Sequence, residues 1–154
     1  MAVSKEVCPF CEIIAGKIQA RRIYEDEHVL AVLDVNPASP GHLLIIPKQH
    51  VRTLAEAPLA LVVYLASVCK QLSWVALRAL HAQGTDIILA QGEAAGQHAG
   101  HLFFHIIPRR DSDGLQPLSI PQQPFTMQDL NDTKAMVVHG IKQVIEGAQP
   151  EGGV

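Results

Sequence analysis

The chain is 154 residues long, about the size of one domain, and 48% of its residues are hydrophobic while 18% are charged. This composition is typical of an ordinary globular protein and excludes a disordered or fibrous one. The formal charge of -3 and the isoelectric point near 6.2 provide no basic surface for a nucleic-acid backbone, so we expect no nucleic-acid partner. Any nucleotide that binds must be small and held by local groups.

Residues 1–7 lack the apolar core of a signal peptide. The apolar stretch that begins at Leu59 is interrupted by Ser67 and Lys70, well short of the roughly 20 residues that a membrane-spanning helix needs. The chain has three cysteines, and their use fits a reducing compartment better than a secreted disulfide scaffold. We therefore predict a cytoplasmic protein without a membrane partner.

Two cysteines near the N-terminus form the motif Cys8-Pro9-Phe10-Cys11. A short helical turn that ends near Gly16 is predicted after this motif. The spacing fits half of a zinc site, in which two further ligands come from elsewhere. It also fits a dithiol redox centre or two merely buried thiols. A thioredoxin-like site needs a buried strand before the motif, and the residues before Cys8 are too polar to form one. Zinc is therefore the favoured interpretation, and His50 becomes a candidate ligand.

Residues 22–25, 28–34 and 43–47 are predicted to form an antiparallel meander, because they are apolar runs bounded by turn residues. The prolines and glycine of residues 34–41 predict an ordered loop rather than a continuing strand. Asp34 stands at the mouth of this loop. Its carboxylate either caps the turn or accepts hydrogen bonds from a ribose diol, and its position alone favours neither interpretation.

Residues 59–82 repeat apolar side chains at three- and four-residue spacing, which predicts one long amphipathic helix. A strand is predicted over residues 86–91. After an extended connection, residues 127–146 show the apolar repeat of a second amphipathic helix. We therefore predict one domain over residues 1–110 and a C-terminal extension over residues 111–154 that packs on the same domain.

The segment from Gly96 to Arg109 is a glycine-marked turn that runs into a histidine-bearing apolar strand. Alternation from His101 onward places His101, Phe103 and His105 on one face, because strand side chains repeat every two residues. The glycines would let a phosphate approach backbone amides, although hairpin turns use the same residues. Arg109 either meets phosphates or solvates the strand end, and the second interpretation is favoured.

Together these motifs resemble the histidine triad (HIT) family from Cys8 to about Arg110. The matching segments are Cys8 to Ile18, Asp34 to Pro37, Gly41 to His50, and Gly96-Gln97 with the histidine strand. The resemblance implies an α+β HIT fold with a five-stranded antiparallel sheet and one long helix, followed here by the C-terminal helix. It also implies a homodimer.

Family members with paired cysteines resemble one another in carrying a structural zinc ion. The positions that match their ligands here are Cys8, Cys11, His50 and His101. The resemblance therefore implies a zinc cofactor, with all four of its ligands present.

HIT enzymes are similar in cleaving a phosphorus bond of a nucleoside monophosphate through attack by the middle histidine of His-x-His-x-His. Here the resemblance places Phe103 at that position, and a phenyl ring has no lone pair with which to attack phosphorus. Losing a nucleophile costs on the order of 10⁴–10⁶ in rate. Ordinary HIT catalysis is therefore predicted to be absent or nearly so.

The predicted function is a zinc-containing HIT protein that binds a small purine nucleotide. The resemblance places Asp34 on the ribose, and Gln97, His98 and His105 near the phosphate and leaving group. Any hydrolysis would use water, with His98 or His105 as general acid or base, or attack by His98 itself. A non-catalytic nucleotide sensor or adaptor and, less favoured, a dithiol redox protein are the alternatives. The sequence does not specify the base, the leaving group or the protein partners. It also does not specify the role of residues 111–125.

Overall fold

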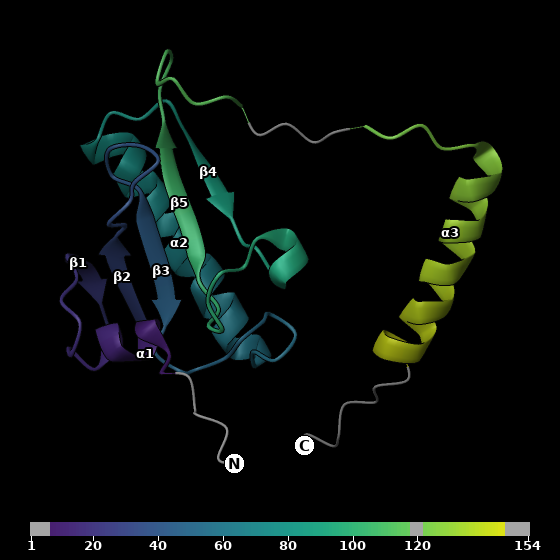
Figure 1. The fold of residues 1–154 in the computed structure, drawn as a ribbon, viewed down its shortest axis with the longest axis horizontal. Coiled ribbons are helices and arrows are strands. Elements are labelled where there is room, and N and C mark those ends of the chain that lie inside the picture. Colours follow the sequence, from purple (N-terminus) through teal and green to yellow (C-terminus); the bar gives the residue numbers. More distant parts are fainter. Residues whose placement is uncertain (1–6, 118–121, 147–154) are drawn as a thin grey trace. The chain divides into compact units, whose positions relative to one another are not determined.

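The computed structural model describes residues 7–117 and 122–146. The chain divides into a compact unit that ends at Leu115 and a second unit that begins at Gln116. The first contains a five-stranded sheet and two α-helices, and the second contains the C-terminal helix (Figure 1). The packing of residues 111–154 on the domain stays a prediction.

All five strands pair antiparallel in the order β1-β2-β3-β5-β4. Their bounds are β1 Arg22–Glu25, β2 Val29–Leu33, β3 Leu43–Pro47, β4 Gly84–Ile88 and β5 Phe104–Arg109. The predicted meander of the first three strands is confirmed. The strand predicted over residues 86–91 is shifted toward the N-terminus, because β4 pairs with β5 from Gly84 opposite Arg109 to Ile88 opposite His105.

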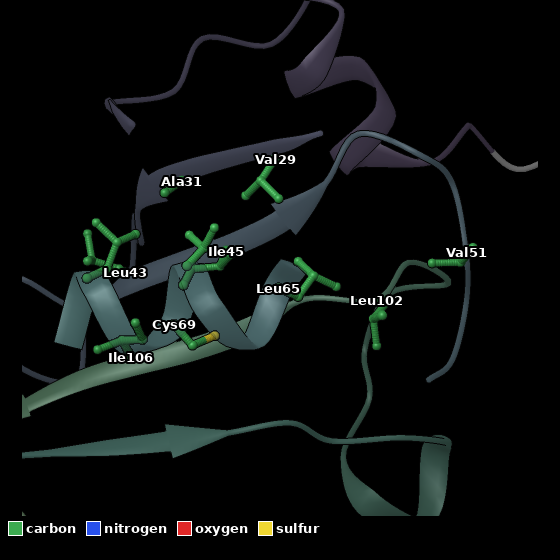
Figure 2. Close-up of a cluster of buried hydrophobic side chains, with 11 residues drawn as sticks. Val29, Ala31, Leu43, Ile45, Val51, Leu65, Cys69, Leu102 and Ile106 are labelled. Atoms are coloured by element: carbon green, nitrogen blue, oxygen red, sulfur yellow. The ribbon is translucent and has the colours of Figure 1, made fainter. Parts of the chain in front are cut away.

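The helix predicted over residues 59–82 is present as α2, Leu59–Ala79, which covers one face of the sheet (Figure 1). Its buried residues keep helical spacing: Leu65, Val68, Cys69, Leu72 and Ala76. Figure 2 shows Leu65 and Cys69 beside Ile45 and Ile106 of the sheet. By length and composition α2 is long and apolar enough to cross a membrane, so the prediction that this stretch is too short was wrong. The buried stripe identifies it as the core helix of the domain.

The short helix α1, Pro9–Ile14, packs on the opposite face of the sheet. Its side chains Phe10 and Ile13 join a second core cluster with Leu30 and Ile46, which alternation directs away from α2. Burying an aliphatic or aromatic side chain contributes roughly 1.5–3 kcal/mol. This packing holds the N-terminal cysteine motif against the sheet.

The turn between β1 and β2 is tied to α2 by the carboxylate of Asp26. It accepts hydrogen bonds from the hydroxyls of Tyr24 and Tyr64 at 2.5 and 2.7 Å. The amides of His28 and Val29 also donate to it, each at 2.8 Å. Burial by itself would raise the pKa of Asp26, but these four hydrogen bonds outweigh it and hold the pKa well below its usual range.

We expect Asp26→Asn to lower the free energy of unfolding by about 2 kcal/mol at pH 7, because hydrogen bonds to a charged acceptor are lost. The pKa of Asp26 is lower in the folded state than its value of about 3.9 in the unfolded state. The carboxylate therefore contributes its full stabilisation of the folded state above about pH 3.9. This contribution is lost as the pH falls through the pKa of the folded state. Urea unfolding at pH 7 and pH 3 should therefore show a smaller difference between wild type and variant at pH 3. The exposed neighbour Glu27, changed to Gln, is the control. A difference that is equal at both pH values would contradict the assignment.

The second unit contains α3, Met127–Ile141, which continues as a π-helical turn over Lys142–Glu146. A capping box starts the helix: the Thr126 hydroxyl accepts from the Asp129 amide, and the Asp129 carboxylate accepts from the Thr126 amide. Helical structure is therefore present over the predicted residues 127–146. Several apolar side chains of α3 are exposed: Met127, Leu130, Met136, Val137, Val138 and Ile141.

Candidate functional site

Two cysteines and two histidines meet where α1, the segment after β3 and the approach to β5 converge. The Sγ atom of Cys8 lies 3.4 Å from Nδ1 of His101. The Sγ atom of Cys11 lies 3.2 Å from Nδ1 of His50 and 3.7 Å from Nδ1 of His101. The two Nδ1 atoms are 3.2 Å apart, and one ligand atom from each residue lies within 4.8 Å of the others.

These distances match the edges of a tetrahedral zinc site. With Zn–S near 2.3 Å and Zn–N near 2.0–2.1 Å, a tetrahedron has S···N edges of about 3.5 Å and N···N edges of about 3.3 Å. Two thiolates and two imidazoles are also donors that zinc accepts readily. The four side chains, which we call the metal cluster, can therefore hold one metal ion.

The buried imidazole of His101 has its other nitrogen held by the backbone. Nε2–H donates to the Pro47 carbonyl at 2.9 Å, which leaves Nδ1 for the metal cluster. Burial lowers the pKa of His101, the Pro47 carbonyl raises it, and His50 lowers it, with a net decrease that favours the neutral, ligating form. Burial and the neighbouring Cys8 raise the pKa of Cys11. A cation bound at the cluster would favour the thiolate of Cys11.

A second polar cluster consists of Asp34, His42 and His105. Nε2 of His42 lies 2.9 Å from Nδ1 of His105, and Nδ1 of His42 accepts a hydrogen bond from the amide of Ala38 at 3.1 Å. Because an amide nitrogen only donates, neutral His42 carries its proton on Nε2 and donates it to His105. The proton of neutral His105 therefore lies on its Nε2.

Both imidazoles of this pair are neutral near pH 7. Burial lowers the pKa of both, His42 lowers that of His105 further, and the Asp34 carboxylate opposes these effects without outweighing them. In the sequence His42 is a lone histidine, and no role is predicted for it. The signal that was missed is that His42 directly precedes β3, whose Leu44 pairs opposite His105.

Asp34 makes the contacts of a turn cap. Its Oδ1 accepts a hydrogen bond from the amide of Asn36 at 2.8 Å, as the capping interpretation expects. Its Oδ2 lies 3.7 Å from Nδ1 of His42. Ribose binding by the same carboxylate stays a prediction.

A cavity of about 350 Å³ opens beside this pair, between α1 and the sheet. Its volume lies within the range of about 300–1,000 Å³ that is common for ligand pockets. Most of its lining is apolar, and the described part of the chain contributes no lysine or arginine to it. The described lining residues are Pro9, Phe10, Ile13, Ile18, Gln19, Ala20, Val32, Leu33, Asp34, Val35, Leu44, Phe103 and His105. We call this cavity the α1 pocket.

Phe103 contributes an aromatic wall to the α1 pocket. Its ring centroid lies 4.7 Å from that of Phe10 and 5.0 Å from that of His105, which it meets edge to face. Leu102 and Ile106 belong to the core cluster that contains Leu65 and Cys69 of α2, which we call the α2 core cluster. Phe103 instead packs against the cluster of Leu30 and Ile46 under α1, so the predicted alternation is confirmed.

The predicted strand start at His101 was wrong, since β5 begins at Phe104. The amide of Leu102 donates to the carbonyl of Val51 at 2.7 Å, in the segment after β3. This bond directs the chain away from the β3 ladder and places His101 beside His50 in the metal cluster.

Comparison with protein families matches residues 15–112 to the HIT domain. This chain belongs to the HIT family. An uncharacterized HIT-like protein of Methanocaldococcus jannaschii is 44% identical over 109 residues, which cover 70% of this chain and 83% of the relative. Adenylylsulfatase HINT3 of Arabidopsis thaliana is 41% identical over 111 residues, and the match covers 70% of this chain but 55% of that relative.

The fold is also that of solved HIT proteins, as predicted. The crystal structure of a Zn-bound histidine triad family protein from Mycobacterium smegmatis superposes with a TM-score of 0.67 at 36% identity. The match covers 86% of this chain and 96% of that chain. The α+β class and the five-stranded antiparallel sheet are therefore confirmed.

In this HIT domain, the Gln97 amide holds the turn that precedes the histidine segment. Its nitrogen donates to the carbonyls of Arg52 and Ala99 at 2.8 and 2.9 Å, and its oxygen accepts from the amide of Gly92 at 2.7 Å. Sequence reasoning assigned Gln97 to the ligand. The structure shows a residue whose polar atoms already stabilise the turn, so its contact with a ligand stays a prediction.

His98, which follows Gln97, has a different environment from Gln97. His98 is exposed on the turn, and within the described residues no hydrogen bond or ion pair joins it to His105. Its role near the phosphate stays a prediction.

Arg109 forms ion pairs with Asp86 and Asp113 at 2.7 and 2.8 Å. These ion pairs favour the interpretation that Arg109 belongs to the strand end over contact with a phosphate.

Proposed function

We propose that this HIT protein contains zinc and binds a small purine nucleotide through its nucleoside part, without the covalent catalysis of the family. The observation that carries the proposal is the α1 pocket, whose apolar walls suit a base and whose Asp34 carboxylate can accept from a ribose diol. The donor set of the metal cluster and the Zn-bound relative support zinc. The phenyl ring of Phe103 supports the absence of a nucleotidylated intermediate.

A titration of AMP and GMP by calorimetry tests the proposal, and we expect micromolar binding of one of them. Asp34→Asn should weaken this binding and remove the preference of the protein for AMP over its 2′,3′-dideoxy analogue, because the ribose diol loses its acceptor. Asp132→Asn on α3 is the matched control and should bind as wild type. Absence of binding at millimolar concentrations, for the nucleotides and for their nucleosides, would overturn the proposal.

A weak hydrolase that uses water is the second candidate. The observation that favours it is the hydrogen bond from His42, which leaves Nε2–H of His105 as a donor toward a phosphate oxygen or leaving group. A well-placed general acid contributes about 10²–10⁴-fold in rate. A relative named for adenylylsulfatase activity adds support. Without this activity, the protein would act as a nucleotide sensor or adaptor.

We also propose a homodimer that forms through β4. This strand is an edge of the sheet, so one side of its backbone is open to pairing. Beside it lies a hollow of about 630 Å³, lined by Lys70, Gln71, Ser73, Trp74, Leu77 and Ile87. Trp74 is 60% exposed and Ile87 is 49% exposed. An apolar patch beside an open strand edge suits a self-complementary contact with a second copy.

We expect Trp74→Glu to convert the dimer to a monomer, because a carboxylate would be buried in the contact. Light scattering coupled to size exclusion measures the mass. The matched control is Ile23→Glu, since Ile23 is also apolar, is 49% exposed and lies on β1 at the other edge of the sheet. A monomeric wild type would contradict the dimer, and a dimeric Trp74→Glu would contradict this interface.

The free state of all three cysteines supports a cytoplasmic location, since reducing compartments keep thiols free. Neither a nucleic-acid partner nor a membrane partner forms part of the proposal.

A further inference from the structure

We propose that the α1 pocket selects neutral purine nucleosides over their 5′-monophosphates. This inference rests on the proposed function and goes beyond it by naming the charge of the preferred ligand. Three features of the pocket carry it: the charges that line it, the protonation of its histidine pair, and the position of Phe103.

Within residues 7–117 and 122–146, the lining of the α1 pocket offers a phosphate no cation. Among the lining residues that the structure describes, Asp34 is the one side chain with a formal charge at pH 7, and that charge is negative. A phosphate monoester carries about -1.5 to -2 charges at this pH. The two anions repel each other, and the apolar walls screen that repulsion less than water does.

The histidine pair provides a neutral donor rather than a cation. His42 donates its Nε2 proton to Nδ1 of His105, so a proton added at Nδ1 of His105 would displace this hydrogen bond. Burial lowers the pKa of both residues, which also disfavours an imidazolium. What remains for a ligand is one neutral N–H group on His105, which suits a hydroxyl as well as a phosphate oxygen.

Phe103 gives an apolar surface to the part of the pocket next to His105. Its ring stands between those of Phe10 and His105, at centroid distances of 4.7 and 5.0 Å. Phosphoryl oxygens placed against a phenyl ring lose water without gaining a hydrogen bond, which is unfavourable. The face of a purine or the apolar side of a ribose can pack on the same ring without this loss.

The test is a calorimetric titration of wild type with adenosine, the methyl ester of AMP, and AMP, which carry increasing negative charge. We expect adenosine to bind about tenfold more tightly than AMP, with the ester between them, because each charge adds repulsion. Raising NaCl from 50 to 500 mM should strengthen AMP binding and leave adenosine unchanged, since salt screens the repulsion. In Phe103→His, the preference for adenosine should diminish, because the added imidazole can donate to phosphate.

The outcomes separate this inference from the proposed function. The selectivity is overturned, while nucleoside binding stands, if AMP binds more tightly than adenosine. The same conclusion follows if the affinity for AMP is equal at both salt concentrations. If none of the three ligands binds at millimolar concentration, the series is repeated with guanosine, the methyl ester of GMP and GMP, and absence of binding there as well overturns both proposals. The salt series uses wild type alone, so the test holds even if Phe103→His does not fold.

Discussion

Replacing Cys11 with alanine is expected to abolish stoichiometric zinc binding and to lower the midpoint of thermal unfolding by roughly 10–15 °C. A ligand at 1,000 times its dissociation constant stabilises the folded state by about 4 kcal/mol, which in a domain of this size corresponds to a shift of that order. The geometry accounts for the size of the effect, because the cluster joins α1 to the segments before β5 and after β3. Without its metal, the buried Nδ1 of His101 also faces a second imidazole at 3.2 Å.

Metal analysis of the purified protein and thermal unfolding with and without a chelator measure both effects. Cys69→Ala is the matched control, because this cysteine belongs to the α2 core cluster and burial raises the pKa of its thiol to about 11. The control should keep its zinc and lose only core packing. A wild type without zinc, in which mild oxidation joins Cys8 to Cys11, would favour the dithiol redox protein instead.

Phe103→His is expected to raise turnover of adenosine 5′-phosphoramidates by about 10³-fold or more, and wild type should form no nucleotidylated intermediate. Removal of a nucleophile costs about 10⁴–10⁶, and an inserted one recovers part of that because its geometry is not refined. The position is suitable, since the side chain of residue 103 shares the face of His105 and touches its ring at a centroid distance of 5.0 Å. Initial rates, single-turnover kinetics and mass spectrometry of the trapped protein measure the gain.

Phe104→His is the matched control for this gain. Its side chain points to the α2 core cluster, so an imidazole there should add no activity. A wild type as fast as Phe103→His would contradict the inference from Phe103 and would favour attack by water with His105 as the acid or base. If neither protein turns over, the loss is not confined to residue 103.

Local patterns in the sequence were sufficient for much of the fold. Periodicity located α2 and the three-stranded meander, and it placed Phe103 and His105 on one face, because side-chain direction follows from local backbone geometry. The four residues of the metal cluster came partly from the spacing of Cys8 and Cys11 and partly from family resemblance. Residue type and spacing indicated half of a zinc site, since zinc accepts few kinds of donor, whereas His101 was assigned through the resemblance.

Only the tertiary structure decided what the remaining polar residues do. His42 meets His105 because β3 pairs with β5, and the amide of Ala38 determines which nitrogen of His42 carries the proton. The Gln97 amide closes its own turn, and Leu102 leaves the ladder through its bond to Val51. These contacts join segments far apart in the chain, and a shift of an ångström would change them. Sequence periodicity determines the face on which a side chain lies, but a hydrogen bond depends on the distance between two such faces, which packing alone sets.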